Sequence, residues 1–359
     1  MTVTSTDSIG HRIAMVRKLA GMTQYQLAAA AHVSKSLITQ VERGKVPASP
    51  AFLAAVTTAL GVDITALNGQ PYQDLVSDPR AETAGIPALR QVLSEHDNPA
   101  PIAELMSLDE LHTRLDAATR LHFRARYAQL SRELPELLSH LYVHWAEPPH
   151  GERDRERLAM LLDDAYALAA TTAFRFGFLD LSAQVDDRRP VTAEATGDPL
   201  RVAGAEFVQT HLPLHRGNYD LCARRLDGAL GLIEDLPGET ARAVRGQLHL
   251  RQAGVAARIT RRADAEAHVA EARDIIASGV PARPYIDINC SAFNADYEYI
   301  SIPLALSDGT TAVTRAGSVH IPANEEPRAV GHHWVLVARG WVLHGNRPKA
   351  LEALNEARS

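Results

Sequence analysis

The sequence predicts an all-α protein in which a small five-helix domain is followed by a helical solenoid. Apolar residues recur at helical spacing from Ile9 almost to the C-terminus, and residues that cap helices stand before many of these stretches. Five similar turns also recur at nearly constant intervals in the second part of the chain. The 359 residues, 46% of them hydrophobic, suffice for two or three packed domains.

The first element of interest is a pair of short helices within residues 23–45. Thr23 and Gln26 form a capping box, so a helix is expected to start at Gln24, with Leu27, Ala28 and Ala31 on its buried face. His32 and Val33 form the turn, and Ser34 caps a second helix that buries Ile38 and Val41. Gly44 stands where a left-handed residue ends that helix. The two helices form a predicted helix-turn-helix.

The flanking residues complete a domain of about seventy residues. Ile9, Ile13, Val16 and Ala20 have helical spacing before the pair. After it, Pro50 to Leu60 predict a further helix closed by Gly61, and Asp63 caps a short final helix that ends near Asn68.

This arrangement resembles the DNA-binding domains of the Cro and phage-repressor-like family, also called the XRE family. The resemblance is carried by Thr23–Gln24, Leu27–Ala28, Val33–Ser34, Ile38, Val41–Glu42, Gly44 and Gly61–Val62. It implies that Gln24 holds a phosphate, that Lys35, Ser36 and Gln40 read bases, and that Arg43 and Lys45 touch the DNA backbone. The expected DNA-binding residues are Gln24, Ser34, Lys35, Ser36, Thr39, Gln40, Arg43 and Lys45.

The polar residues of this face also fit a plainer interpretation, a solvated face of an ordinary helical hairpin. Lys suits guanine, and Gln suits adenine or phosphate, at the start of a second helix that enters the major groove.

Arg17 and Glu42 match two family positions that pair, so we expect an internal ion pair there. Leu37 departs from the small polar residue often found at its position.

Charge separates the two parts of the chain. Residues 1–70 carry six Lys and Arg against three acids, a balance of +3, whereas the whole chain has −6 and the remainder therefore −9. A basic reading domain on an acidic body suits DNA binding, but three positive charges attract a duplex weakly. We therefore expect a homodimer that places two domains on one operator, an inverted repeat with half-sites about ten base pairs, or a multiple, apart.

We expect a linker at residues 71–85, rich in turn residues, and a second domain over residues 86–359. Its last helical pair has the spacing of a tetratricopeptide repeat, with Trp334, Ala338, Trp341, Gly345 and Ala350 at characteristic positions. Equivalent turns fall at Gly177, Gly217, Thr260 and Ser307, each followed five residues later by a small residue: Ser182, Cys222, Ala265, Ala312 and, in the last pair, Ala350. The same spacings also occur in other helical bundles.

With the N-terminal domain, this pattern looks like actinobacterial-type regulators that join an XRE domain to a degenerate tetratricopeptide sensor; LPELL at 134–138 and GDPLRVAGAEF at 197–207 carry that likeness. The layout is also similar to peptide-sensing regulators of Gram-positive quorum systems. A solenoid has a concave surface that can bind a peptide or small molecule. The candidate effector-binding residues are Tyr166, Arg175, His211, Arg251, Asn294 and Tyr297, with a pocket expected near residues 281–295. Each also fits an ordinary polar position in a helix.

Other classes of function have little support in the sequence. His211 and His215 share a helical spacing, but Pro213 lies between them and no HExxH motif accompanies them, so we expect no metal and no cofactor. GxSxG and GxxxxGK[ST] motifs are absent, which argues against an enzyme. Cys222 and Cys290 are expected to be buried free thiols. The chain has no apolar segment that could span a membrane and no signal peptide, so a cytoplasmic protein is expected.

The resulting expectation is a DNA-binding transcriptional regulator controlled by a peptide or small-molecule effector bound in the helical repeats. The alternative is an antitoxin-like or scaffold protein, whose repeats bind a partner protein and whose N-terminal domain serves only autoregulation.

Overall fold

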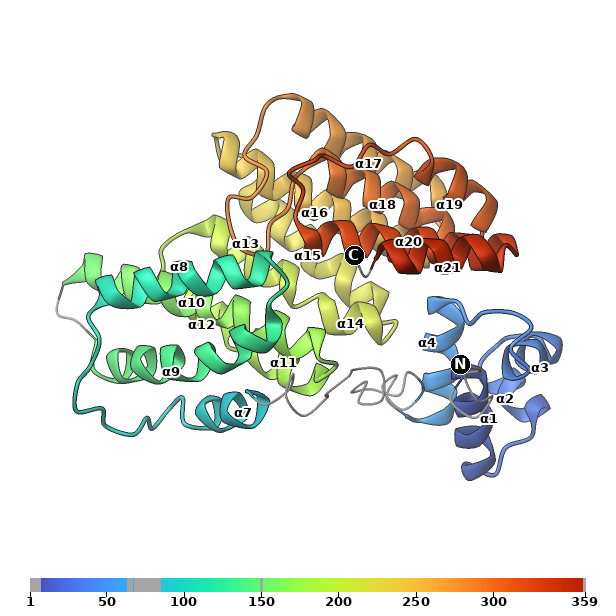
Figure 1. Cartoon of the computed structure of the whole chain (residues 1–359), viewed down its shortest axis with the longest axis horizontal. Coiled ribbons are helices and arrows are strands. Elements are labelled where there is room, and N and C mark those ends of the chain that lie inside the picture. The colour runs from blue at the N-terminus through green and yellow to red at the C-terminus, as the bar shows by residue number, and fades with distance from the viewer. Residues whose placement is uncertain (1–7, 63–66, 68–84, 149–150, 358–359) are drawn as a thin grey trace.

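A computed structural model describes residues 8–62, 67, 85–148 and 151–357 of the chain, and its regular elements are all helices. Figure 1 shows a small N-terminal group of helices, here called the head, beside a larger helical domain. The described head helices are α1 (Ile9–Leu19), α2 (Gln24–Ala30), α3 (Lys35–Glu42) and α4 (Pro50–Leu60). The expected final helix after Asp63 and most of the expected linker, residues 71–85, lie outside the described residues.

Local capping determines where the head helices begin and end. Thr23 and Gln26 form the predicted capping box, Ser34 accepts from the Leu37 amide, and Gly61 ends α4 in the left-handed conformation. The buried faces of these helices then meet in one core, with Ile13, Leu27, Ile38 and Val56 fully buried. Gly10 brings α1 directly against the Val41 carbonyl of α3, where a side chain would overlap that oxygen. The orientation of α3 is therefore fixed by close packing.

The helical domain begins at Ile86. Its described helices are α7 (Ile86–Ser94), α8 (Leu108–Phe123), α9 (Tyr127–Ala146), α10 (Glu152–Arg175), α11 (Leu179–Asp186), α12 (Arg189–Ala195), α13 (Pro199–Val208), α14 (His211–His215), α15 (Tyr219–Ile233), α16 (Glu239–Arg258), α17 (Arg262–Ala277), α18 (Ala292–Ala305), α19 (Gly309–Ala316), α20 (Pro327–His344) and α21 (Arg347–Glu356).

The solenoid prediction is confirmed by how these helices pack. Each main helix packs on helices one to three positions away along the chain, which is the nearest-neighbour pattern of a solenoid. All five predicted turn residues have positive φ, from +60° at Ser307 to +90° at Gly345. The small residues that follow the turns are buried, at most 5% exposed, where paired helices approach each other.

The solenoid is irregular in three places. The amphipathic stretch from Leu108 is divided at Ala125, whose φ of +56° separates α8 from α9. The helix before the turn at Gly217 is interrupted and appears as α13 and the short α14. A long connection between α17 and α18 contains Pro281 to Ser291, so most of the segment expected near the pocket is loop, and α18 begins at Ala292.

The head contacts the helical domain through α4. Gly217, in the turn between α14 and α15, lies so close to Ala54 of α4 that a methyl group at Gly217 would overlap the Ala54 side chain. Figure 1 shows α4 on the side of the head that faces α14, with α3 on the opposite side. The contact therefore leaves α3 away from the helical domain.

Candidate nucleic-acid interface and effector cavity

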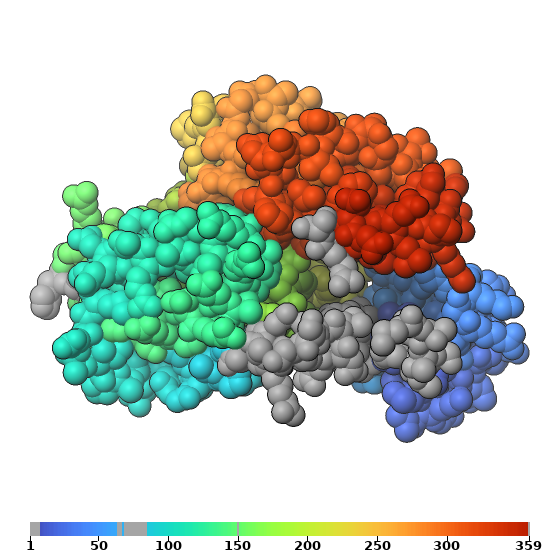
Figure 2. Space-filling view, viewed as in Figure 1, coloured from blue at the N-terminus to red at the C-terminus, as the bar shows by residue number. Residues whose placement is uncertain are grey.

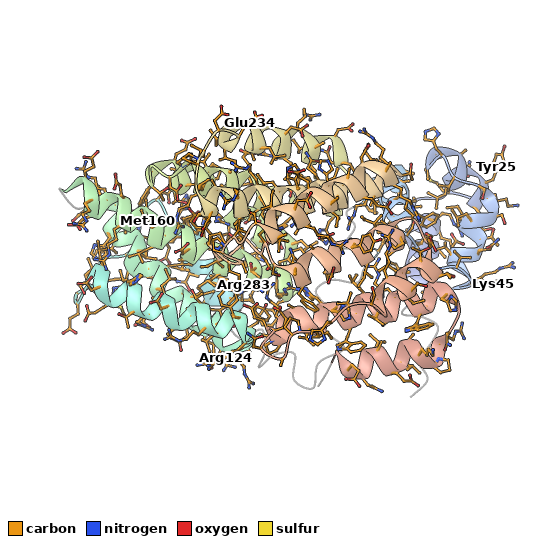
Figure 3. The ribbon with its side chains drawn as sticks, turned by 90° about the horizontal axis from the view of Figure 1, so that it is seen from above. Tyr25, Lys45, Arg124, Met160, Glu234 and Arg283 are labelled. Atoms are coloured by element: carbon orange, nitrogen blue, oxygen red, sulfur yellow. The ribbon has the colours of Figure 1, made fainter. Side chains whose placement is uncertain are left out.

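The outer side of α3 is accessible to a ligand. Its apolar residues Ile38 and Val41 are buried in the head, whereas the polar residues predicted to meet DNA are exposed: Ser34, Lys35, Ser36, Gln40, Arg43 and Lys45. The Gln40 side-chain amide donates to the Ser36 hydroxyl at 3.0 Å, so these two side chains are held side by side. Figure 3 shows Lys45 pointing away from the helical domain. A polar face that projects from a rigid helix has the form that major-groove readout requires.

Arg17 and Glu42 form an ion pair inside the head. Arg17 Nε donates to Glu42 Oε1 at 2.6 Å and Nη2 to Oε2 at 3.0 Å, while Nη1 donates to the Met22 carbonyl at 2.8 Å. The side chains are only 9% and 6% exposed. This bidentate pair joins the end of α1 to the end of α3 and thus supports the orientation of the exposed face.

Gln24 and Thr39 extend this network. Gln24 Nε2 donates to Glu42 Oε2 at 2.7 Å, and Gln24 Oε1 accepts from the Thr39 hydroxyl at 3.0 Å. Both residues are half-buried, unlike the other predicted DNA-binding residues. A phosphate contact from Gln24 stays a prediction, and the second hydrogen of its amide nitrogen could supply it. Tyr25, next to Gln24 on α2, is 71% exposed. The helical pattern of α2 alone did not identify it as a candidate site residue.

The network also sets the charge state of Glu42. Burial raises the pKa of this carboxyl, but the hydrogen bonds from Arg17 and Gln24 and the charge of Arg17 outweigh burial, and the net pKa is lowered. Glu42 therefore remains an anion at neutral pH and neutralises Arg17. The positive charge available to DNA comes from the exposed residues outside this pair.

A cavity of about 490 Å³ lies on the inner side of the helical domain. Its wall includes residues of α10, α13, α14, α16, α18 and α20. Most of these helices come directly before one of the repeat turns. The space-filling view shows a hollow between the segment of α8 and the C-terminal helices, with the segment of α13 and α14 visible behind it (Figure 2). The volume is in the range of sites for small molecules or short peptide segments.

Five of the six sequence candidates for effector binding line this cavity: Arg175, His211, Arg251, Asn294 and Tyr297. The prediction for Tyr166 is wrong. Tyr166 is 4% exposed and packs in the core of the helical domain, with its ring centroid 6.1 Å from that of Tyr142. The residue lies on α10 like Arg175, but on a different face, which the apolar spacing of this largely buried helix does not distinguish.

Aromatic rings and a half-buried amide organise the wall of the cavity. His211 lies beside Phe207, with ring centroids 5.5 Å apart, and the Arg251 guanidinium stacks 4.5 Å from the centroid of the Phe207 ring. Asn294 Nδ2 donates to the Asn289 carbonyl at 2.7 Å, which fixes the connection before α18 against that helix. The wall thus combines apolar surface with oriented polar groups.

Burial and neighbouring arginines lower the pKa of two histidines that line the cavity. Burial first, and then the charges of Arg328, Arg175 and Arg283, lower the pKa of His122 to about 3. Burial, Arg175 and Arg328 likewise lower the pKa of His332 to about 3. Both imidazoles are therefore neutral at pH 7. Arg283 and Arg328, which the sequence did not single out, also cause these shifts, and they lie more than 100 residues from Arg175 along the chain.

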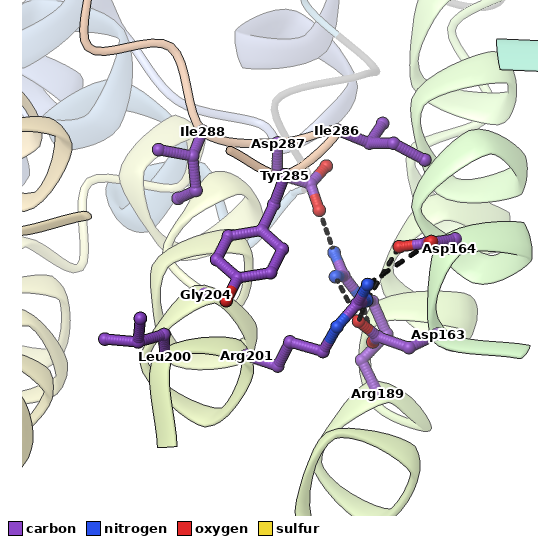
Figure 4. A pocket seen from close by; sticks show the side chains of 10 residues that line it. All are labelled: Asp163, Asp164, Arg189, Leu200, Arg201, Gly204, Tyr285, Ile286, Asp287 and Ile288. Carbon is purple, nitrogen blue, oxygen red and sulfur yellow. Dashed lines mark hydrogen bonds and ion pairs between the residues drawn. The ribbon is translucent and has the colours of Figure 1, made fainter. Parts of the chain in front are cut away.

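A network of buried charges stands next to this cavity (Figure 4). Arg189 pairs with Asp163 and with Asp287, and Arg201 pairs with Asp163 at 2.9 Å and with Asp164 at 2.7 Å. The space among these residues is only about 10 Å³. The network joins α10, α12 and α13 to the connection before α18, and it therefore shapes one wall of the larger cavity.

The histidines and thiols show no arrangement for metal chemistry within the described ranges, where no group of three or more His, Cys, Asp and Glu side chains gathers as ligands. His215 Nδ1 lies 2.8 Å from the His211 carbonyl. Cys222 and Cys290 are free and buried, and burial raises the pKa of the Cys290 thiol to about 11. None of the described helices combines the length and apolar character that a membrane span requires.

Comparisons with known proteins support the interpretation of the head as a helix-turn-helix domain. Residues 8–68 match the family model described as a helix-turn-helix domain. Over 75 residues the chain is 36% identical to the immunity repressor protein of Bacillus phage phi105. This matched region is 21% of this chain and 51% of the repressor. The chain thus spans about half the length of that curated relative.

Two solved structures are distantly similar over most of the chain. The structure of Bacillus thuringiensis PlcR in complex with the peptide PapR7 and DNA has a TM-score of 0.33 at 14% identity, covering 76% of this chain and 95% of that one. The apo form of the competence regulator ComR from Streptococcus vestibularis has a TM-score of 0.27 at 14% identity, covering 70% and 99%.

Proposed function

We propose that this chain, in which an XRE-type helix-turn-helix domain precedes a C-terminal helical domain, is a sequence-specific transcriptional regulator controlled by a bound effector. The exposed polar face of α3, opposed to a buried apolar face, carries this proposal. Lys35, Ser36 and Gln40 contact base edges, while Arg43 and Lys45 contact phosphates. The proposed site of action is the cytoplasm.

The effector, a peptide or small molecule, binds in the cavity of the helical domain. Pro50, the first residue of α4, lines this cavity together with residues of the solenoid. Ala54, one turn later, is the residue that meets Gly217. An effector that prefers one arrangement of the solenoid therefore changes the surface on which the head rests. Its differential affinity shifts the population of heads that can reach DNA.

Two copies of the chain bind one operator. The last described helical pair, α20 and α21, exposes Val342, Leu351 and Leu354 by 42–63%. Exposed apolar surface of this kind favours association with another protein surface. A symmetric pair of chains places two heads on an inverted repeat.

Selection from a pool of random DNA duplexes tests the proposed function. The full chain is incubated with the pool at about 100 mM salt, bound duplexes are amplified, and the enriched sequences are read. We expect an inverted repeat with half-site centres separated by about ten base pairs or a multiple. Enrichment of no sequence over the starting pool would contradict the proposal, because a sequence-specific regulator must discriminate among duplexes.

A further inference from the structure

The arginines of the cavity form two groups that differ in their partners. Arg283 lies 2.9 Å from Glu326, and Arg328 lies 3.4 Å from the same carboxylate, so these two are paired. Within the described part of the chain, the other four have no carboxylate within 4.0 Å: Arg175, Arg251, Arg258 and Arg339. Arg175, Arg251 and Arg258 are half-buried, and Arg339 is exposed. The cavity thus concentrates unpaired positive charge.

The acids in the wall do not neutralise these arginines. Asp287 is bound by Arg189 of the neighbouring network. Burial raises the pKa of Asp186 to about 8 despite the opposing charge of Arg189, so Asp186 is mostly protonated at pH 7. Glu298 attracts Arg251 but accepts a hydrogen bond from Ser301 at 2.8 Å. At most one of the three carboxylates therefore opposes four cations.

Some of the guanidinium groups in the wall also have a buried donor without an acceptor. Arg175 Nε and Arg328 Nε are buried and have no hydrogen-bond partner among the described residues. Arg175 Nη1 contacts the neutral ring of His332. Burial, and in addition the charge of Arg258, lowers the pKa of Arg251. Buried donors without acceptors and like charges at close range both destabilise the empty arrangement.

We propose that the effector is an anion of small-molecule or short-peptide size, whose carboxylate or phosphate oxygens bind Arg175 and Arg251, with Arg258 and Arg339 adding positive charge to the same cavity. Guanidinium forks bind both kinds of oxygen in a bidentate manner. Phe174, Phe207 and Phe293 line the same cavity and contact the apolar body of the ligand. The term effector rests on the proposed function, whereas the anion site itself does not depend on DNA binding.

Thermal unfolding of the full chain with defined probes tests this site. Citrate, inorganic pyrophosphate and penta-glutamate are added at constant ionic strength, with sodium chloride as the reference and spermidine as the cationic probe. The proposal predicts a saturable rise in Tm with at least one anionic probe and none with spermidine. The three anions distinguish a carboxylic acid, a phosphate and an acidic peptide as the source of the charge.

Variants distinguish the proposed site from general attraction of anions. Arg175→Gln and Arg251→Gln, made singly and together, are compared with Arg224→Gln, which removes an exposed positive charge of α15 outside the cavity. We expect the cavity variants to bind the anion at least tenfold more weakly and Arg224→Gln to bind it like the original chain. Without an anion, Arg251→Gln should melt at or above the original temperature, because a repelled and unpaired charge has been removed. Circular dichroism verifies folding, and Arg258→Gln is the second variant if the double variant does not fold.

The outcomes separate the anion site from the proposed function. Absence of a Tm rise with every anion, or an equal rise in the cavity variants, would overturn the anion site even if the operator is still bound. A rise that requires Arg175 and Arg251 establishes the site. If operator affinity then remains unchanged on adding the anion, the site stands and the control of DNA binding fails.

Discussion

Arg17 and Glu42 support the orientation of α3 through their buried ion pair. Arg17→Ala leaves the Glu42 carboxylate, 6% exposed, without its bidentate partner, and we expect the head to lose about 3 kcal/mol of stability. All three tryptophans, Trp145, Trp334 and Trp341, lie outside the head. The loss should therefore appear as an early transition in circular dichroism that tryptophan fluorescence does not follow. Coincident unfolding of the variant and the original chain by both probes would contradict the role of the pair.

The pH dependence of the head follows from the same carboxyl. The pKa of Glu42 is lower in the folded head than its ordinary value of 4.5, so its contribution to stability is complete above that value and is lost as pH falls through the folded pKa. The stability advantage of the original chain over Glu42→Gln should therefore shrink below about pH 4.5. Chemical unfolding of the head, followed by circular dichroism between pH 7 and 3, measures this difference. A constant difference would show that Glu42 does not titrate with folding.

Arg189 is the corresponding residue of the helical domain. It is 4% exposed, and Arg189→Ala would leave Asp287 without its cation and Asp163 with Arg201 alone, at a cost of about 3–5 kcal/mol. Arg225, whose pair with Glu206 is about one-third exposed, provides the control, and Arg225→Ala should cost less than about 1 kcal/mol. Urea unfolding followed by tryptophan fluorescence compares them. Equal losses would contradict the structural role of the buried network.

At the scale of single residues, the sequence predicted those whose roles depend only on residues close to them in the chain. Thr23, Ser34 and Gly61 perform their capping roles because capping depends on a few adjacent residues. Arg189 was missed because its partners are 26 and 98 residues away, and no local spacing connects them. The cavity arginines were missed in part for the same reason.

At the scale of elements, the turn between α14 and α15 holds the head in place. Gly217 and Gly345 both have positive φ, +77° and +90°, but a methyl group would overlap Ala54 only at Gly217 and would meet nothing within 4 Å at Gly345. Both Gly→Ala substitutions impose backbone strain of about 1–2 kcal/mol. Only Gly217→Ala should also increase amide hydrogen exchange in α4 and its contact surface. Equal exchange in the two variants would show that the head does not depend on this contact.

The repeat turns show how far elements can be predicted from the sequence. A turn requires a left-handed residue and a small residue five positions later, and both requirements are local, so all five turns were predicted. Thr260 and Ser307 adopt the same conformation without being glycine, at φ of +64° and +60°. The break between α13 and α14 and the loop before α18 were not predicted, because they depend on packing between repeats.

At the scale of the whole molecule, the proposed association of two chains depends on the apolar surface of α20 and α21. Leu351→Glu combined with Leu354→Glu adds charge to the exposed apolar surface of α21 and should convert a dimer into a monomer, measured by light scattering at about 10 μM. Val191, 62% exposed on α12, provides the control, and Val191→Glu should leave the mass unchanged. A monomeric original chain, or a double variant that remains dimeric, would contradict this interface.

The most direct measurement of the central claim compares DNA binding by α3 variants. Lys35→Ala combined with Gln40→Ala removes two exposed side chains without altering the buried face of α3. Lys18→Ala removes an exposed positive charge of the same head outside α3. Titration of the selected operator and a scrambled duplex at equal salt gives the preference of each chain. We predict that the preference falls by about 1–3 kcal/mol for each side chain that no longer binds a base edge in the double variant, and that it persists in Lys18→Ala. An unchanged preference in the double variant would contradict the assignment of α3 as the helix that reads DNA.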